Sequence, residues 1–199
     1  MEHRRLGSTG MYVSELTYGN WITHGSQVEA EAATKCVRAA LEYGITTLDT
    51  ADVYAGTRAE TVLGKALRDI PRNSFFLSTK VGKNTAPGGY GVDTFNYSYD
   101  AIMRSVDESA ARIGVDYFDI LHLHDIEYNN REHTEWALLE GIQTLLTLKE
   151  EGRIGAVGMG IYPVDLWERV IDEGIIDVGL TRGDVLDKAV ALLPDGIDA

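Results

Sequence analysis

The feature that most constrains the fold is a regular alternation of short β-like segments and amphipathic helical segments. Strands are predicted at 16–19, 45–49, 75–79, 117–123, 154–158 and 175–180, and helices at 29–43, 59–69, 99–113, 134–151, 164–173 and 184–193. Residues 3–18, with turn glycines at Gly7 and Gly10, are predicted to form a β-hairpin, and no hairpin is expected after it. This alternation favours parallel strands joined by right-handed helical crossovers.

Two α/β architectures satisfy this pattern: an open doubly wound sheet and a β/α barrel. The doubly wound sheet usually carries a Gly-x-Gly-x-x-Gly fingerprint after its first strand, and none follows 16–19. A barrel distributes its chemistry over several strand ends, as this sequence does. We therefore expect a (β/α)8 barrel of the TIM type, truncated to about six β/α units, because a closed barrel needs eight. Residues 1–199 are expected to be one incomplete domain.

Charge and cysteine content limit the partners and the compartment. The formal net charge is −13, which disfavours binding to nucleic acids and to anionic membranes. No run of 18 apolar residues is present, and the polar N-terminus does not resemble a signal peptide. The single cysteine, Cys36, excludes an internal disulfide and favours a cytoplasmic protein. It lies in the apolar stripe of helix 29–43, so we expect it in the core.

Ionisable side chains end or follow three successive predicted strands. Asp49 ends the strand at 45–49, Tyr54 follows it, Lys80 follows 75–79 and His124 follows 117–123. Interconversion of a carbonyl and an alcohol by hydride transfer needs a proton donor, and a tyrosine beside a cation can fill that role. Lys80 would be the cation that lowers the pKa of Tyr54, Asp49 its counter-ion, and His124 a second hydrogen-bond donor to the carbonyl oxygen.

Each of these residues, taken singly, also has a purely structural explanation. Asp49 could cap a turn, and Lys80 could be a solvated strand end. His122 and His124 lie two positions apart, so both point to one side of a regular strand and one could simply fill the barrel interior. Asp52 and Asp125 are expected to be polar loop residues.

A long connection at 81–98 contains four glycines and three aromatic residues. A connection of this length in a small domain is usually a lid or a binding segment. The side chains expected to contact substrate are Trp21, His24, Tyr90 and Phe95.

Three stretches of the sequence resemble the aldo-keto reductase family: 48–54, 78–80 and 116–124. The resemblance runs from the hairpin to about residue 180 and implies a barrel plugged by that hairpin, with NADP or NAD bound across its top. The family's catalytic tetrad would fall on Asp49, Tyr54, Lys80 and His124, with His124 preferred to His122. The cofactor would contact Gly19, Asn20, Trp21, Asp49 and Gly160. Within the family, 90–98 and 124–127 resemble the aldose dehydrogenases related to L-galactose and D-arabinose dehydrogenases, and 18–65 resembles the potassium-channel β-subunit branch.

The sequence departs from the family pattern in two places. Gly160 and Ile161 stand where the family usually has a Ser-Asn pair that binds the nicotinamide carboxamide. The segments that would form strands seven and eight, and hold the rest of the cofactor, are missing after Leu180. The first and sixth strands would then be open edges. The sheet could curl into an incomplete barrel capped by helix 184–193, two chains could form a homodimer that covers the gap, or the chain could fold poorly.

The sequence thus supports two hypotheses. The first is an NAD(P)-dependent oxidoreductase that acts on an aldose or a small carbonyl compound and binds no metal. The alternative is a non-catalytic, reductase-like binding or interaction protein, or an inactive fragment.

Overall fold

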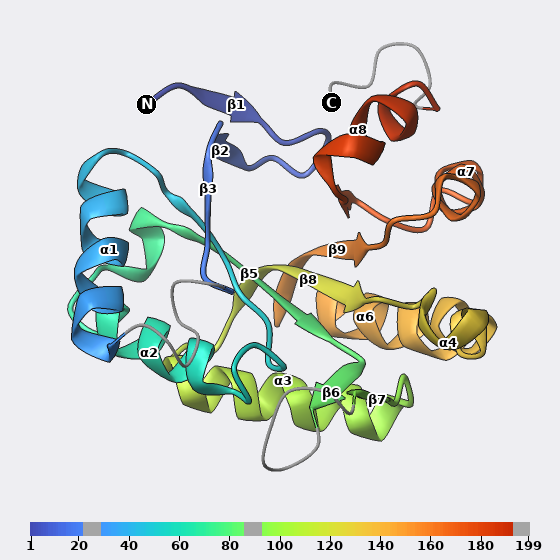
Figure 1. The fold of residues 1–199 in the computed structure, drawn as a ribbon, viewed down its shortest axis with the longest axis horizontal. Helices are drawn as coiled ribbons and strands as arrows, with labels where there is room; N and C mark the ends of the chain where they lie inside the picture. The colour runs from blue at the N-terminus through green and yellow to red at the C-terminus, as the bar shows by residue number, and fades with distance from the viewer. Residues whose placement is uncertain (22–28, 86–92, 193–199) are drawn as a thin grey trace.

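A curved sheet of six parallel strands forms the centre of the molecule (Figure 1). The structure is a computed structural model that describes residues 1–21, 29–85 and 93–192. The strands run in the order β10-β9-β8-β5-β4-β3. Their bounds are β3 (Thr17–Gly19), β4 (Thr47–Asp49), β5 (Phe76–Val81), β8 (Phe118–His124), β9 (Ile154–Gly160) and β10 (Val178–Leu180).

Helices lie along the outer side of the curved sheet (Figure 1), and all but the last of them connect its strands. They are α1 (Ala30–Glu42), α2 (Arg58–Leu67), α3 (Tyr99–Ile113), α6 (Ile142–Glu150), α7 (Val164–Asp172) and α8 (Gly183–Val190). The shorter helical segments are η1 (Arg72–Ser74), α4 (Tyr128–Arg131), α5 (Thr134–Trp136) and η2 (Ala137–Gly141). The predicted truncated β/α barrel is therefore confirmed.

Local sequence signals explain where α3, the longest of these helices, begins and ends. The Ser98 side chain accepts a hydrogen bond from the Ala101 amide and so caps the first turn. Gly114 follows the last turn with φ of 83°, a left-handed conformation that favours glycine. The helix buries Ile102 and Val106 on the face that it turns toward the core.

Two antiparallel hairpins accompany the parallel sheet. β1 (His3–Arg5) pairs with β2 (Tyr12–Ser14), as predicted for the N-terminal segment. β6 (Lys83–Thr85) pairs with β7 (Asp93–Phe95), so the expectation of no further hairpin was wrong. Strands of three residues are too short to show a period of two in the sequence, which is why the long connection concealed them.

The core lies between the sheet and its helices. All seven residues of β8 are buried, as expected for a central parallel strand that is covered on both faces. Cys36 is exposed, so its predicted place in the core was wrong. The buried residues of α1 are Ala33, Val37 and Ala40, which follow helical spacing. Cys36 lies about 100° around the helix from Val37 and therefore faces solvent.

The two end strands of the sheet, β3 and β10, do not pair with each other, so the barrel is open within the described residues. α8 packs against α7. Among the described residues, no helix is long and apolar enough to span a membrane.

Candidate active site

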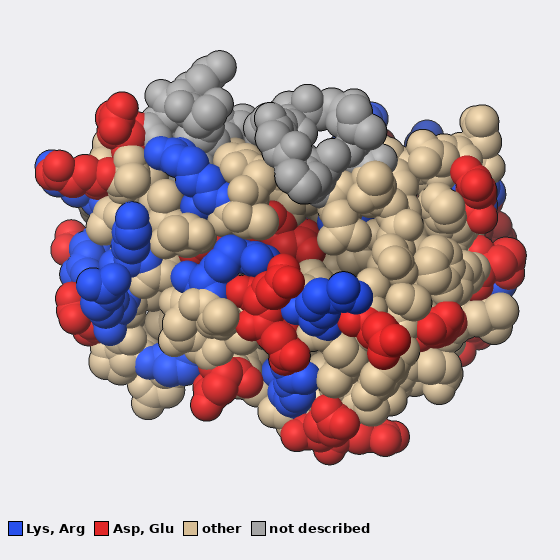
Figure 2. Space-filling view, turned by 90° about the horizontal axis from the view of Figure 1, so that it is seen from below, with Lys and Arg blue, Asp and Glu red and all other residues tan. Residues whose placement is uncertain are grey.

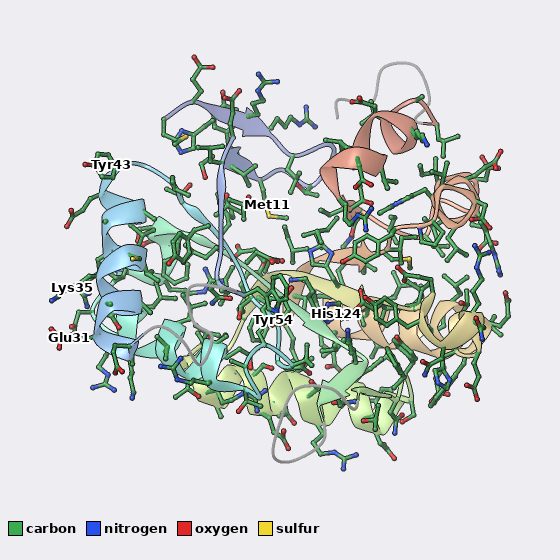
Figure 3. All side chains as sticks on the ribbon, viewed as in Figure 1. Met11, Glu31, Lys35, Tyr43, Tyr54 and His124 are labelled. Atoms are coloured by element: carbon green, nitrogen blue, oxygen red, sulfur yellow. The ribbon has the colours of Figure 1, made fainter. Side chains whose placement is uncertain are left out.

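The four candidate catalytic residues meet at the carboxyl ends of β4, β5 and β8. Asp49 is the last residue of β4, Lys80 lies next to the end of β5, and His124 is the last residue of β8. Tyr54 comes from the loop after β4. Because parallel strands end at the same edge of a sheet, side chains far apart in the sequence become neighbours. Figure 3 shows Tyr54 and His124 side by side near the centre of the molecule, and their ring centroids are 5.9 Å apart.

A buried ion pair between Lys80 and Asp49 is the best-defined feature of this site. The Lys80 ammonium lies 2.9 and 2.7 Å from the two carboxylate oxygens of Asp49. It also donates to the Thr50 carbonyl oxygen at 2.7 Å. The Ser78 hydroxyl donates to Asp49 at 2.9 Å and helps to fix the carboxylate. The Lys80 side chain is 1% exposed, so its charge depends on these partners rather than on water.

Tyr54 lies against this ion pair. The Lys80 Nζ is 4.9 Å from the centroid of the phenol ring. Burial alone would lower the pKa of Lys80, but the Asp49 carboxylate, followed by Tyr54, more than offsets it and raises that pKa. Burial raises the pKa of Tyr54 and outweighs the opposing effect of the Lys80 charge. Lys80 therefore acts to lower the pKa of Tyr54, as expected, but burial keeps that pKa above its ordinary value.

The two histidines of β8 are buried and uncharged at neutral pH. Burial, together with the Lys80 and Lys83 charges, holds the pKa of His124 well below its usual range. The pKa of His122 falls to about 4, chiefly through burial. His124 packs edge-on against Tyr54, whereas no ring contact joins His122 to Tyr54 within the described residues. The Tyr97 hydroxyl donates to the His124 carbonyl oxygen at 2.7 Å and anchors the end of β8.

The residues expected to contact substrate are only partly brought to the tetrad. The indole of Trp21 lies 6.5 Å from the Tyr54 ring and is exposed. Phe95 packs instead on Tyr97 and His133, with ring centroids 6.4 and 5.6 Å apart. His24 and Tyr90 lie outside the described residues.

The residues expected to hold a cofactor include a buried amide without partners. Asn20 is 1% exposed, and neither its side-chain oxygen nor its nitrogen has a hydrogen-bond partner in the described part of the chain. Its backbone amide donates to the Asp49 carbonyl, so the side chain starts beside the ion pair. Gly19 is exposed at the end of β3, and a Cβ added to Gly160 would come no closer than 3.6 Å to any other residue. An amide that needs partners and a strand end without a side chain fit a planar carboxamide ligand such as nicotinamide.

Sequence reasoning missed a second buried ion pair beside His124. Lys83 donates to Asp125 at 2.7 Å, and Oδ2 of Asp125 lies 3.8 Å from Nε2 of His124. Asp125 and Asp52 lie in loops, as expected, but each is only 5% exposed and therefore buried. The only sequence signal that could have pointed to this ion pair was the position of Asp125 directly after His124, which ends a strand. Among the described residues, no group of three or more His, Cys, Asp or Glu side chains could hold a metal ion.

Comparison with known proteins identifies relatives along most of the chain. The model of the Aldo/keto reductase family matches residues 15–181. L-galactose dehydrogenase from Arabidopsis thaliana is 35% identical over 189 residues, which cover 91% of this chain and 56% of that protein. A probable voltage-gated potassium channel subunit beta from Oryza sativa is 34% identical over 126 residues, covering 62% of this chain and 37% of that protein. The chain thus spans about half the length, or less, of these two relatives.

A solved structure resembles this chain in fold as well as in sequence. A putative aldo-keto reductase from Pseudomonas aeruginosa superimposes with a TM-score of 0.80 at 29% identity. The match covers 95% of this chain and 72% of that one.

Proposed function

Because the chain belongs to the aldo/keto reductase family, we propose that it is an oxidoreductase that transfers hydride between NADP or NAD and an aldose or small carbonyl compound. The observation that carries this proposal is the contact of Tyr54 with the buried Lys80–Asp49 pair on one side and His124 on the other. The similarity to L-galactose dehydrogenase favours an aldose as the substrate.

In the proposed mechanism, the side chains handle the proton while a bound nicotinamide supplies or accepts the hydride. Tyr54 donates its phenol proton to the carbonyl oxygen of the substrate as that oxygen gains negative charge. The Lys80 ammonium, held in place by Asp49, stabilises the phenolate that remains. The neutral imidazole of His124 donates a hydrogen bond to the same oxygen and orients the carbonyl.

The pKa of Tyr54 indicates which direction is favoured at neutral pH. Because burial raises that pKa, the phenol is protonated at pH 7 and ready to act as the acid in carbonyl reduction. Oxidation of an alcohol needs the phenolate as base, and the phenolate becomes available only at alkaline pH. We therefore propose that reduction is nearly independent of pH around neutrality, whereas oxidation accelerates as the pH rises toward the pKa of Tyr54.

Three residues near the tetrad are proposed to hold the nicotinamide end of the coenzyme. Asn20 would bind the carboxamide through the amide atoms that now lack partners. Gly160 would leave room for the ring, and the exposed indole of Trp21 would cover it. Coenzyme binding should then quench the fluorescence of Trp21.

The test measures oxidation of NADPH or NADH by the full chain with a panel of aldoses that includes galactose and arabinose. Tyr54→Phe should reduce the rate at least about a hundredfold, because general acid catalysis usually contributes that much. Tyr43→Phe is the matched control, since Tyr43 is 78% exposed and lies at the C-terminal end of α1, away from Tyr54, as Figure 3 shows. Equal rates for Tyr54→Phe and the wild type would refute the proposed acid. Coenzyme that neither binds nor is oxidised would refute the proposed function.

A further inference from the structure

A polar pocket lies outside the candidate active site. It encloses about 350 Å³ between the loop that follows β4 and the exposed side of α3. Asp52, Thr57, Asn84, Arg104, Glu108 and Arg112 contribute to its walls. None of the four tetrad residues lines it. Its volume falls in the range of pockets that hold small molecules.

Asp52 is a buried group in this pocket, and one of its carboxylate oxygens has no side-chain hydrogen-bond partner among the described residues. The residue is 5% exposed. Oδ2 accepts a hydrogen bond from the Ser105 hydroxyl at 2.5 Å, whereas Oδ1 accepts none from any described side chain. The backbone amide of Val53 also stabilises the charged form of this carboxylate. An unpaired buried carboxylate oxygen is costly, and the soft terminal torsion of an aspartate allows it to turn toward a ligand.

The two arginines of the pocket differ in the hydrogen bonds and ion pairs that they already make. Arg112 donates to Glu60 at 2.7 Å and to Ser109 at 3.0 Å, and it lies 3.6 Å from Glu108. Arg104 is exposed and makes no ion pair with any described residue. Figure 2, the view from below, shows acidic and basic side chains interspersed over that face of the molecule.

Among the described residues, the pocket therefore combines a buried carboxylate with one oxygen open to a further side-chain or ligand contact, Asp52, and a guanidinium without an ion-pair partner, Arg104. A ligand with only one charge would be attracted by one group and repelled by the other. We propose that this pocket binds a small zwitterion, with an ammonium group at Asp52 and a carboxylate at Arg104. Guanidinium and carboxylate groups form strong, paired hydrogen bonds, which suits Arg104 to the second contact.

Ligand binding should be linked to the release of a proton from Asp52. Burial, followed by the Glu60 charge, raises the pKa of Asp52 to about 7, against the opposing effects of Ser105 and Arg112. Arg104 and Glu108 from α3 also face the pocket. An ammonium ion beside the carboxylate favours its charged form and lowers its pKa. Binding at pH 6 should therefore release about one proton per ligand, and binding at pH 9 should release none.

The experiment is isothermal titration calorimetry of the full chain with glycine, β-alanine, 4-aminobutyrate and 6-aminohexanoate. The series varies the separation of the two charges, and butylamine and butyrate each lack one of them. We expect at least one zwitterion to bind with a dissociation constant at or below about 1 mM, and both singly charged probes to bind at least about tenfold more weakly. Repeating the titration at pH 6 in buffers of different ionisation enthalpy measures the released proton.

Two variants test the proposed contacts. Asp52→Asn and Arg104→Gln should each weaken binding at least about tenfold, and Asp52→Asn should abolish proton release. Arg68→Gln is the control, because Arg68 is an exposed arginine that does not line the pocket. If circular dichroism shows that Asp52→Asn is unfolded, the exposed Arg104→Gln decides the result. No binding of any zwitterion below 10 mM, or unchanged binding in a folded variant, would overturn the proposal.

Discussion

Replacing Asp49 with asparagine tests how strongly the candidate active site depends on its buried ion pair. The substitution keeps the shape of the side chain but leaves the Lys80 ammonium, which is 1% exposed, without its counter-ion. Breaking a buried pair by removing one partner usually costs about 3–5 kcal/mol. The Asp49 side chain is 14% exposed, so some water reaches the pair and the lower end applies. We expect Asp49→Asn to lower the free energy of unfolding at pH 7 by about 3 kcal/mol.

The pH dependence of this loss follows from the pKa of Lys80. In the wild type that pKa is raised, so the stabilisation is complete below the unfolded pKa of about 10.4 and is lost only as pH rises through the folded value. In the variant, burial without Asp49 lowers the pKa of Lys80, and deprotonation at alkaline pH relieves the penalty. The difference in stability between the two proteins should therefore be largest near neutrality and smaller at pH 10.

Urea denaturation followed by circular dichroism at pH 7 and pH 10 measures both effects. A loss of about 3 kcal/mol lowers the midpoint by roughly 1.5 M urea for a slope of about 2 kcal/mol/M. Glu31→Gln is the matched control, because Glu31 and Lys35 form an exposed ion pair on α1, visible in Figure 3, that should contribute almost nothing. An Asp49→Asn protein as stable as the wild type, or one whose deficit persists unchanged at pH 10, would refute the reasoning.

Four further substitutions test the surroundings of the candidate active site and the buried carboxylate of the polar pocket. Tyr97→Phe removes the hydroxyl that donates to the buried carbonyl at the end of β8, and chemical denaturation should show a loss of about 1–3 kcal/mol. Gly158→Ala places a Cβ 2.2 Å from Nδ1 of the buried His122 and should lower the free energy of unfolding by about 1–3 kcal/mol. Gly160→Ala, whose Cβ meets nothing closer than 3.6 Å, should change thermal stability little. Equal effects of the two substitutions on stability would contradict this account. The pKa of Asp52 is raised to about 7 in the folded protein, so its contribution to stability is complete below the unfolded pKa of about 3.9 and is lost as the pH rises to 7. The free energy of unfolding of Asp52→Asn, relative to that of the wild type, should therefore increase between pH 4 and pH 7.

Much of the fold was predictable because strands and helices alternate with distinct periods. The apolar runs of β5 and β8 and the amphipathic pattern of α3 each identified one element. Parallel pairing then predicts that Asp49, Lys80 and His124 lie at one edge of the sheet. Short elements were the exception, since β6 and β7 have three residues each and carry no readable period.

Properties that depend on three-dimensional surroundings were not predictable. The sequence shows Asp52 and Asp125 in polar stretches, and only packing against α3 and β6 buries them. The sequence also places a lysine near Tyr54 but does not reveal the balance between burial and charge that sets the pKa of the phenol. Cys36 belongs to an apolar stripe of the sequence, yet it is exposed because it lies about 100° around α1 from the buried Val37.

The central claim is that Tyr54, supported by Lys80, delivers a proton while hydride passes to a carbonyl carbon. Its most direct test uses reduced coenzyme deuterated at C4 of the nicotinamide, an aldose substrate, and mass spectrometry of the product. We predict one deuterium at the former carbonyl carbon per turnover with the wild type, and almost no labelled product with Tyr54→Phe. Absence of label from the wild-type product, or undiminished labelling by Tyr54→Phe, would contradict the claim.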